Sequence, residues 1–454
     1  MRSKKLFGTR GIRGSILTKV TPELMLRLGR ALAEYVDGGS VVVGRDTRTS
    51  GEMLTRAFTA GLLSGGSEAI EIGVAPSPCV AFTTRSLRAS AGVAITASHN
   101  PPTDNGIAFY RSDGMEFLPE DEIAIEEMVF ERIPRSAEWN ELGKIRYHEP
   151  IAPYLEAIKK LVKIKGHLKV VIDCANGAGS LTTPRLLREL GCKVVTLNSH
   201  PDGHFPGRPA EPQPWNLYDL MQTTREVGAD IGLAHDGDAD RIAAVDELGN
   251  FIKHDALIAL FAGLAVEARG GGSVVTSVNT SASIEEVVAR AGGKTFRTPL
   301  GNFTSAMLEH NACFAGEPGK LVFLEHGPWA DGVLGAAKLL ELISSEQKPI
   351  SKILAYRVPD YPMFFEDFTC PDEKKVEFMQ EMREYILNNV DDVRDVLDID
   401  GLRVNRKNGS WILVRVSGTE PKARLVVEGR DEEELERLRS IGIKKINEFL
   451  KIKP

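Results

Sequence analysis

Residues 40–63 read SVVVGRDTRTSGEMLTRAFTAGLL and run from a β-branched segment through a polar turn into an amphipathic stretch. Residues 40–44 predict a strand and residues 52–63 a helix, with Thr49 and Glu52 spaced as a capping box. A strand that leads through a turn into an amphipathic helix is the unit from which parallel α/β layers are built. This stretch therefore predicts an α/β fold.

The same order of elements recurs twice further along the chain. Residues 169–173 predict a second strand, which a turn at 174–179 joins to a helix at 183–190. Residues 273–277 and 284–291 predict a third strand and helix in the same way. The recurring order of strand, turn and helix indicates three related α/β domains with mixed sheets. They need not be strict repeats, because no fixed period relates them.

The end of the chain follows a different pattern. Residues 411–416 and 423–428 predict two strands, and residues 432–450 predict a charged closing helix, which together indicate a smaller α+β domain. A chain of 454 residues is too long for a single hydrophobic core. We therefore expect four domains, over residues 1–148, 149–252, 253–362 and 363–454.

The composition narrows the classes of partner. A formal net charge of -7 argues against nucleic acid, because phosphate-backbone binding requires a basic surface. No apolar run of ~18 residues occurs, and residues 1–11 lack the apolar stretch of a signal peptide. We therefore expect a cytoplasmic protein without membrane contact, and a homo-oligomer is compatible with the sequence. The five cysteines form no CxxC pair, so neither a zinc site nor a disulfide framework is expected.

Three aspartates alternate with small residues in DGDADR, residues 236–241, between two apolar runs. Carboxylates at alternate positions can converge when a short loop bends around a hard cation, and oxygen ligands suit Mg²⁺. An EF-hand is excluded, because Arg241 stands where the sharp turn needs glycine and because the flanks predict strands. A solvated acidic hairpin turn is the alternative, although three carboxylates this close repel one another without a cation.

A serine stands in the segment TASHNPP, residues 96–102, which follows the apolar stretch 91–95. Ser98 therefore lies just beyond a predicted strand and ahead of two rigid prolines, on a loop where its hydroxyl or a phosphate ester could face a cleft. Ordinary turn chemistry explains the same residues. The segment by itself leaves both alternatives open.

Two further segments offer anion-binding groups. Residues 415–421, RVSGTEP, combine with Arg424 to offer backbone N–H groups, hydroxyls and guanidiniums that can hold a phosphate, although a plain strand-turn-strand explains them equally well. Residues 7–14, FGTRGIRG, place Arg10 and Arg13 on an N-terminal loop, which is also typical of a solvated terminus. Neither a P-loop nor a GxGxxG loop is present, which disfavours nucleotide hydrolysis.

Taken in order, these motifs form one set. FGTRGIRG, TASHNPP, DGDADR, the pair Gly316-Glu317 and RVSGTEP resemble the α-D-phosphohexomutase superfamily, closest to the archaeal phosphoglucosamine mutase and phosphomannomutase/phosphoglucomutase group. The resemblance implies four domains around a central cleft. It implies a phosphohexomutase that interconverts hexose 1-phosphate and 6-phosphate, with glucosamine, mannose or glucose as the sugar. It also implies a phosphoserine, Mg²⁺ as cofactor, and a hexose 1,6-bisphosphate as intermediate and activator.

The resemblance implies a role for each matching residue. Ser98 would carry the phosphoryl group, and the catalytic set would also comprise Arg13, Arg241 and His99. Mg²⁺ would bind Asp236, Asp238, Asp240 and the phosphate on Ser98. The phosphosugar would contact Arg10, Glu317, Gly301, Arg415, Ser417, Gly418, Thr419 and Arg424.

Three positions depart from the family pattern. Ala108 stands where the family often has lysine, the loop 316–320 is one residue shorter than the family's sugar loop, and residues 300–302 read LGN. We expect Arg111, the nearest cation in sequence, to replace the missing lysine. The departures favour one alternative to a mutase, a non-catalytic phosphosugar-binding sensor. A metal-dependent phosphatase with an aspartate nucleophile fits the DxD spacing but not the serine loop.

Overall fold

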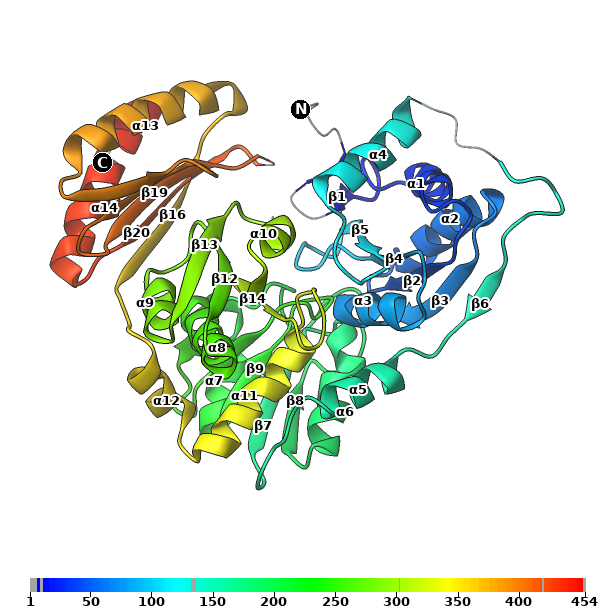
Figure 1. The fold of residues 1–454 in the computed structure, drawn as a ribbon, viewed down its shortest axis with the longest axis horizontal. Helices are drawn as coiled ribbons and strands as arrows, with labels where there is room; N and C mark the ends of the chain where they lie inside the picture. Colours follow the sequence, from blue (N-terminus) through cyan, green and yellow to red (C-terminus); the bar gives the residue numbers. More distant parts are fainter. Residues whose placement is uncertain (1–5, 9–10, 132–135, 302, 419, 452–454) are drawn as a thin grey trace. The chain divides into compact units, whose positions relative to one another are not determined.

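The computed structural model describes residues 6–8, 11–131, 136–301, 303–418 and 420–451 (Figure 1). The chain divides into two compact units. Unit 1 comprises Met1–His254 and Gly319–Leu354, and unit 2 comprises Asp255–Pro318 and Ala355–Pro454. Among the helices in these described ranges, none is both long and apolar enough to cross a membrane.

The first sheet of unit 1 has six strands in the order β1-β5-β4-β2-β3-β6. They are β1 (Ile12–Ser15), β2 (Val41–Arg45), β3 (Ala69–Val74), β4 (Ala91–Ile95), β5 (Asp104–Arg111) and β6 (Ile145–Tyr147). Its helices are α1 (Pro22–Tyr35), α2 (Gly51–Ser64), α3 (Ser77–Ser86) and α4 (Pro119–Phe130). β4 pairs in parallel with β2 and antiparallel with β5. Ser98 therefore follows the strand at which the sheet changes from parallel to antiparallel.

Helix α2 follows β2 as the sequence predicts, but its first turn differs. Ser50 is the N-cap residue, and its side chain makes no capping hydrogen bond to the described part of the helix. The predicted capping box of Thr49 and Glu52 is wrong. The Glu52 carboxylate instead pairs with Arg45 and with Arg56, each at 2.8 Å, so it is not available to the backbone.

The second sheet of unit 1 has the order β11-β10-β9-β7-β8. Its strands are β7 (Lys169–Asp173), β8 (Lys193–Leu197), β9 (Ile231–Ala234), β10 (Ala243–Val245) and β11 (Phe251–Ile252). The helices are α5 (Ile151–Lys159), η1 (Ala178–Leu181), α6 (Thr183–Glu189), η2 (Pro214–Asn216) and α7 (Tyr218–Glu226). β9 and β10 form an antiparallel hairpin, whose connecting loop carries the three aspartates.

A later part of the chain returns to unit 1. It contains β15 (Lys320–Phe323) and α11 (Gly332–Glu346), and α12 (Ile350–Arg357) follows across the division between the units. The Gly319 carbonyl accepts from the Ile242 amide at 2.7 Å, and Lys320 forms a β-bridge with Arg241. The start of β15 therefore packs directly beside the loop of the three aspartates.

Unit 2 begins with an α/β part. β12 (Gly272–Ser277) pairs in parallel with both β13 (Gly293–Thr298) and β14 (Ala312–Glu317). The helices of this part are α8 (His254–Arg269), α9 (Ser283–Arg290) and α10 (Phe303–Glu309). β12 and α9 correspond to the strand predicted at residues 273–277 and the helix predicted at residues 284–291.

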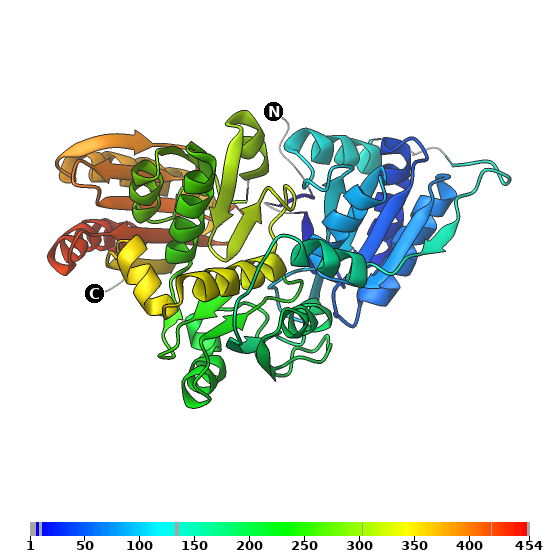
Figure 2. The same cartoon turned by 60° about the horizontal axis from the view of Figure 1, so that its bottom comes forward.

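The C-terminal part of unit 2 is an antiparallel sheet in the order β16-β20-β19-β18-β17. Its elements are β16 (Met363–Thr369), η3 (Asp372–Lys374), α13 (Lys375–Asn389), β17 (Val393–Leu397), β18 (Leu402–Arg406), β19 (Trp411–Val416), β20 (Lys422–Glu428) and α14 (Glu432–Leu450). Apolar side chains of α13 and α14 pack on the strands of this sheet. Figure 2 draws this C-terminal part of the chain in orange and red. The predicted fold class is confirmed: three α/β domains precede a smaller α+β domain.

Candidate active site

Ser98 lies three residues beyond β4, in an uncommon backbone conformation. Its φ of 52° falls in the left-handed region, which costs a non-glycine residue about 1–3 kcal/mol. The Ser98 amide donates to the Thr96 hydroxyl at 2.8 Å, and the Ser98 side chain is fully buried. A conformation with this cost persists only where the surrounding structure imposes it.

The buried guanidinium of Arg48 holds the loop of Ser98 in this backbone conformation. Arg48 pairs with Asp46 at 3.0 Å and donates to four backbone carbonyls. Those carbonyls belong to Ser98, Asn100, Pro101 and Asp104. Asp46 also accepts from the Thr96 hydroxyl at 2.7 Å. The buried ion pair therefore fixes the serine loop at two places: Asp46 binds it at Thr96, before the serine, and Arg48 binds the carbonyls from Ser98 onward.

Asp236, Asp238 and Asp240 converge in the hairpin loop between β9 and β10. One carboxylate oxygen of each lies within 4.8 Å of the other two, and all three residues are buried. Ser98 Oγ donates to Asp236 Oδ2 at 2.7 Å, across 138 residues of sequence. The two strongest sequence motifs thus meet inside unit 1, and the alternative of a solvated acidic turn is wrong.

The cluster fits a divalent cation. Asp238 Oδ2 accepts from Ser77 Oγ at 2.6 Å, whereas Asp238 Oδ1 is buried with no hydrogen-bond partner among the described residues. Burial and the nearby Asp240 raise the pKa of Asp236, and they raise the pKa of Asp238 to about 8. Lys320, whose Nζ donates to Asp240 Oδ2, opposes both shifts. Carboxylate oxygens are ligands that suit Mg²⁺, and a bound cation would relieve the repulsion among the three buried carboxylates.

A neutral histidine holds the two ends of the aspartate loop. His235 Nδ1 donates to the Arg241 carbonyl at 2.8 Å, and His235 Nε2 accepts from the Thr183 hydroxyl at 2.8 Å. Burial lowers the pKa of His235 to about 4, so the ring stays neutral at neutral pH. Arg208 donates to the His235 carbonyl at 2.7 Å and pairs with Asp173 at 3.0 Å. The loop is therefore braced before any ligand binds.

Glu211 connects two of the predicted catalytic residues. Its carboxylate pairs with Arg241 and lies 3.5 Å from His99 Nε2. Burial lowers the pKa of His99, and the charges of Arg241 and Arg13 lower it further, so the ring is neutral at neutral pH. His99 Nδ1 lies 3.3 Å from Ser98 Oγ. The structure thus brings Ser98, His99 and Arg241 together at the carboxylates of unit 1, and it places Arg13 on β1, opposite Gly106 of β5.

In unit 2, the predicted sugar-binding and phosphate-binding segments are linked by a residue that the motifs did not reveal. Glu317 Oε2 accepts from the Gly301 amide at 2.9 Å. Asp400 accepts from the Leu300 amide at 3.3 Å and pairs with Arg415 at 3.2 Å. Asp400 therefore couples the Gly301 turn to the arginine that we expect to bind phosphate.

The other phosphate-binding candidates occupy the same end of unit 2. Arg424 faces Arg415 in the β19–β20 pair and forms an ion pair with Asp367 at 2.9 Å. The Ser417 hydroxyl accepts from a backbone amide of its own loop at 3.1 Å, and the space beside Gly418 is open. Two further candidates, Arg10 and Thr419, lie outside the described residues.

Arg111 does not reach the aspartates. It ends β5 opposite Ala91, and its guanidinium lies 3.9 Å from Asp121. The prediction that Arg111 replaces the missing lysine of the serine segment is wrong, because β5 carries it away from Ser98. Two cations contact the cluster: Arg241 lies 3.8 Å from Asp236, and Lys320, which the sequence motif groups with the sugar loop, pairs with Asp240.

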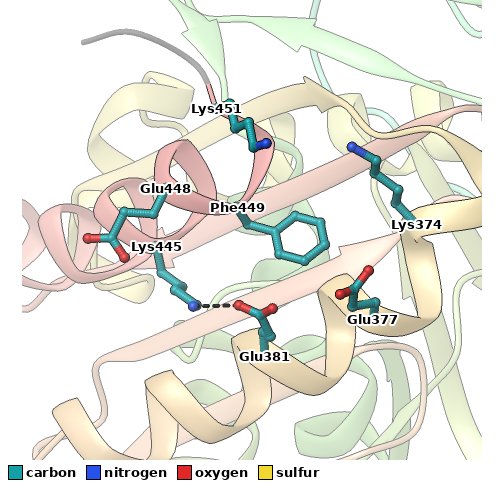
Figure 3. Close-up of a pocket in the computed structure, with 7 residues that line it drawn as sticks. All are labelled: Lys374, Glu377, Glu381, Lys445, Glu448, Phe449 and Lys451. Carbon is teal, nitrogen blue, oxygen red and sulfur yellow. Dashed lines mark hydrogen bonds and ion pairs between the residues drawn. The ribbon is translucent and has the colours of Figure 1, made fainter.

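A groove between α13 and α14 in unit 2 offers no comparable chemistry. Figure 3 shows the side chains that line it: Lys374, Glu377, Glu381, Lys445, Glu448, Phe449 and Lys451. Lys445 and Glu381 pair there at 2.6 Å. The charged groups are of both signs and at least partly exposed, which is typical of an ordinary solvated surface.

The fold and the site together define a multidomain α/β protein in which a buried serine faces a carboxylate cluster suited to Mg²⁺. Models of the four domains of phosphoglucomutase/phosphomannomutase match the chain: alpha/beta/alpha domains I, II and III at residues 4–135, 152–249 and 253–361, and the C-terminal domain at 368–441. The chain therefore belongs to the phosphoglucomutase/phosphomannomutase family. It is a phosphomutase of carbohydrate metabolism, and the resemblance inferred from the motifs is confirmed.

Individual relatives match over nearly their full length. A phosphopentomutase from Thermococcus kodakarensis is 45% identical over 448 residues, covering 98% of this chain and 99% of the relative. A probable phosphoglucosamine mutase from Methanopyrus kandleri is 44% identical over 440 residues, covering 96% of each chain. The crystal structure of a phosphoglucomutase/phosphomannomutase family protein from Burkholderia thailandensis has a TM-score of 0.88 at 26% identity, covering 100% of this chain and 99% of that one. The names of the two relatives point to different sugars.

The anchoring role of Arg48 predicts a local loss of stability in Arg48→Met. Removing one partner of a buried ion pair costs about 3–5 kcal/mol, because the other charge is left buried. Amide hydrogen exchange in residues 96–104 should therefore accelerate by at least about 100-fold. Arg45→Met, which removes a partly exposed pair with Glu52, is the control and should change exchange little. Equal exchange in both variants would contradict the anchoring role.

The raised pKa of Asp238 predicts that Mg²⁺ binding releases a proton. Without metal the folded-state pKa is about 8, above the ordinary value of 3.8, so the metal-free protein loses stability as pH rises from about 4 to 8. Mg²⁺ needs the ionised carboxylate, so its affinity should rise by up to about 10-fold per pH unit between pH 6 and 8 and then level off. Titration calorimetry in two buffers of different ionisation enthalpy measures this. An affinity independent of pH, with no proton released, would rule it out.

Proposed function

We propose that this protein moves a phosphoryl group between the two ends of a sugar monophosphate through a phosphorylated Ser98, with Mg²⁺ as cofactor. The observation that carries the proposal is the hydrogen bond of 2.7 Å between Ser98 Oγ and Asp236 Oδ2, inside a buried cluster of three carboxylates. A serine in a strained backbone conformation, beside a site for a hard cation, suits a nucleophile that takes up and returns phosphate.

The metal would be held by Asp236, Asp238 and Asp240 together with the phosphate on Ser98. When bound, Mg²⁺ supplies positive charge that offsets the charge on the phosphoryl oxygens. The fit rests on the donor set, since all three ligands are carboxylates and Asp238 Oδ1 is buried without a partner among the described residues.

Side chains of unit 1 would do the remaining work at the reacting group. The Arg48–Asp46 pair fixes the serine, so little rearrangement is needed at the moment of transfer. Asp236 Oδ2 is placed to accept the hydroxyl proton when unphosphorylated Ser98 attacks a sugar bisphosphate. Arg13 and Arg241 add positive charge for the phosphoryl oxygens, and Glu211 orients Arg241.

We assign the rest of the sugar phosphate to the segments that resemble the family's sugar-binding and phosphate-binding loops. We assign Glu317 to sugar hydroxyls, with the Gly301 amide fixing its carboxylate. We assign the non-reacting phosphate to a set of two guanidiniums and a loop of hydroxyl and backbone N–H donors. That set comprises Arg415, Ser417, Gly418, Thr419 and Arg424. Because both ends of the sugar must meet one serine, the bisphosphate intermediate has to turn around before it leaves.

Two classes of sugar are candidates. The motifs favour the hexose phosphates of glucosamine, mannose and glucose, and a glucosamine mutase is among the relatives at 44% identity. A pentose phosphate is a further candidate substrate, because a phosphopentomutase is 45% identical to this chain over 98% of its length. A non-catalytic sensor is disfavoured, because binding alone needs neither the strained Ser98 nor three buried carboxylates.

The proposal predicts that Ser98→Ala abolishes isomerisation of every accepted sugar. Coupled assays with Mg²⁺ should compare the 1-phosphates of glucosamine, mannose, glucose and ribose, each with a trace of its bisphosphate. Loss of the phosphoryl carrier should lower kcat by at least about 1,000-fold, because no other group in the site can take up and return the phosphate. Ser64→Ala, at the end of α2, is a matched control that should keep full activity. Turnover by Ser98→Ala at the wild-type rate would exclude the phosphoserine route.

A further inference from the structure

Lys320 is a lysine in an unusual place. Its side chain is 1% exposed, and its Nζ donates to Asp240 Oδ2. Lysines are almost never fully buried unless paired. The partner in this case is one of three carboxylates that we assign to a metal, so the lysine takes part in the charge balance of that site.

The backbone holds Lys320 at the cluster. The Gly319 carbonyl accepts from the Ile242 amide at 2.7 Å, and Lys320 forms an antiparallel bridge with Arg241. Gly319 has a φ of 82°, a conformation that glycine adopts without strain. The ammonium group is therefore delivered from a strand that packs on the aspartate loop, and it does not depend on the serine segment.

The charges explain why a cation is needed even without metal. Three buried carboxylates within 4.8 Å repel one another, and burial adds to the cost of ionising each of them. Lys320 supplies one positive charge in direct contact with Asp240. A divalent ion that binds the same carboxylates must therefore approach a fixed ammonium group, and the two cations repel each other.

We infer that Lys320 is a built-in competitor of the metal: it holds Asp240 when no divalent ion is bound, and it weakens the affinity of the site for that ion. The inference rests on the metal site of the proposed function. It makes Lys320 a positioning residue, which acts through Asp240. A site of this kind keeps the loop folded in the metal-free protein and binds Mg²⁺ reversibly.

The first test measures Mg²⁺ affinity by titration calorimetry on full-length protein shown by intact mass to carry no phosphate. Lys320→Met removes the charge and keeps an unbranched side chain, so Mg²⁺ should bind at least about 10-fold more tightly. Lys320→Arg keeps the charge and should stay within about threefold of the wild type. Lys338→Met removes a lysine that pairs with Glu325 and Glu341 on the surface of unit 1, and its affinity should not change.

The second test compares melting temperatures in EDTA and in saturating MgCl₂. Lys320→Met should be destabilised more in EDTA than in Mg²⁺, because the ion takes over the charge that the lysine supplied. An equal loss in both buffers would mean that Lys320 is only a packing element, and would overturn the inference. If Lys320→Met does not fold in either buffer, Lys320→Gln, which can still donate to Asp240 without a charge, is measured with the same expectations.

The outcomes separate this inference from the proposed function. A wild-type protein that takes up no Mg²⁺ contradicts the metal site itself, and the inference fails with it. A wild-type protein that binds Mg²⁺, with Lys320→Met binding equally or more weakly, overturns the role of Lys320 alone. Tighter binding in Lys320→Met, with Lys320→Arg near the wild type, supports both.

Discussion

The repulsion among three buried carboxylates is the constraint on which the site of unit 1 depends. Asp236, Asp238 and Asp240 can share one small volume only because hydroxyl donors, a buried lysine and a braced hairpin loop surround them. One of the hydroxyls belongs to Ser98, whose own loop is fixed by the buried Arg48. Serine and carboxylates are thus positioned independently and meet at 2.7 Å. A cation relieves the repulsion at the point where a phosphoryl group would add further negative charge.

Much of the domain architecture and the principal residues of the site could be predicted from the sequence. Strands rich in β-branched residues and amphipathic helices carry their own periodicity, so the three α/β domains and the final α+β domain follow from pattern alone. The serine and the three aspartates also stand out, because a hydroxyl before two prolines and alternating carboxylates are chemically unusual. Their proximity could be expected from the family resemblance, but the residues by themselves do not contain it.

The contacts of three basic residues could not be predicted, because they depend on the path of the chain beyond each motif. Lys320 follows Glu317 by three residues, yet the chain leaves unit 2 at Pro318, so the two side chains belong to different units. Arg111 is close to Ala108 in sequence, but β5 separates it from the aspartates. Arg48 stands in a polar turn of ordinary composition, and only the folded structure shows that its guanidinium donates hydrogen bonds to four backbone carbonyls. Burial and tertiary pairing decide these roles, and neither is encoded in local spacing.

The central claim is that Ser98 carries the phosphoryl group that reaches the sugar, and a single-turnover transfer experiment tests it most directly. Enzyme that carries a labelled phosphate on Ser98 is mixed with an excess of an unlabelled sugar monophosphate that it accepts, and the reaction is quenched within the first turnover. If Ser98 is the carrier, the label should leave Ser98 at least as fast as product forms, and it should appear first in the sugar bisphosphate and then in the product monophosphate. Product formation while the label stays on Ser98, or is released as inorganic phosphate, would contradict it.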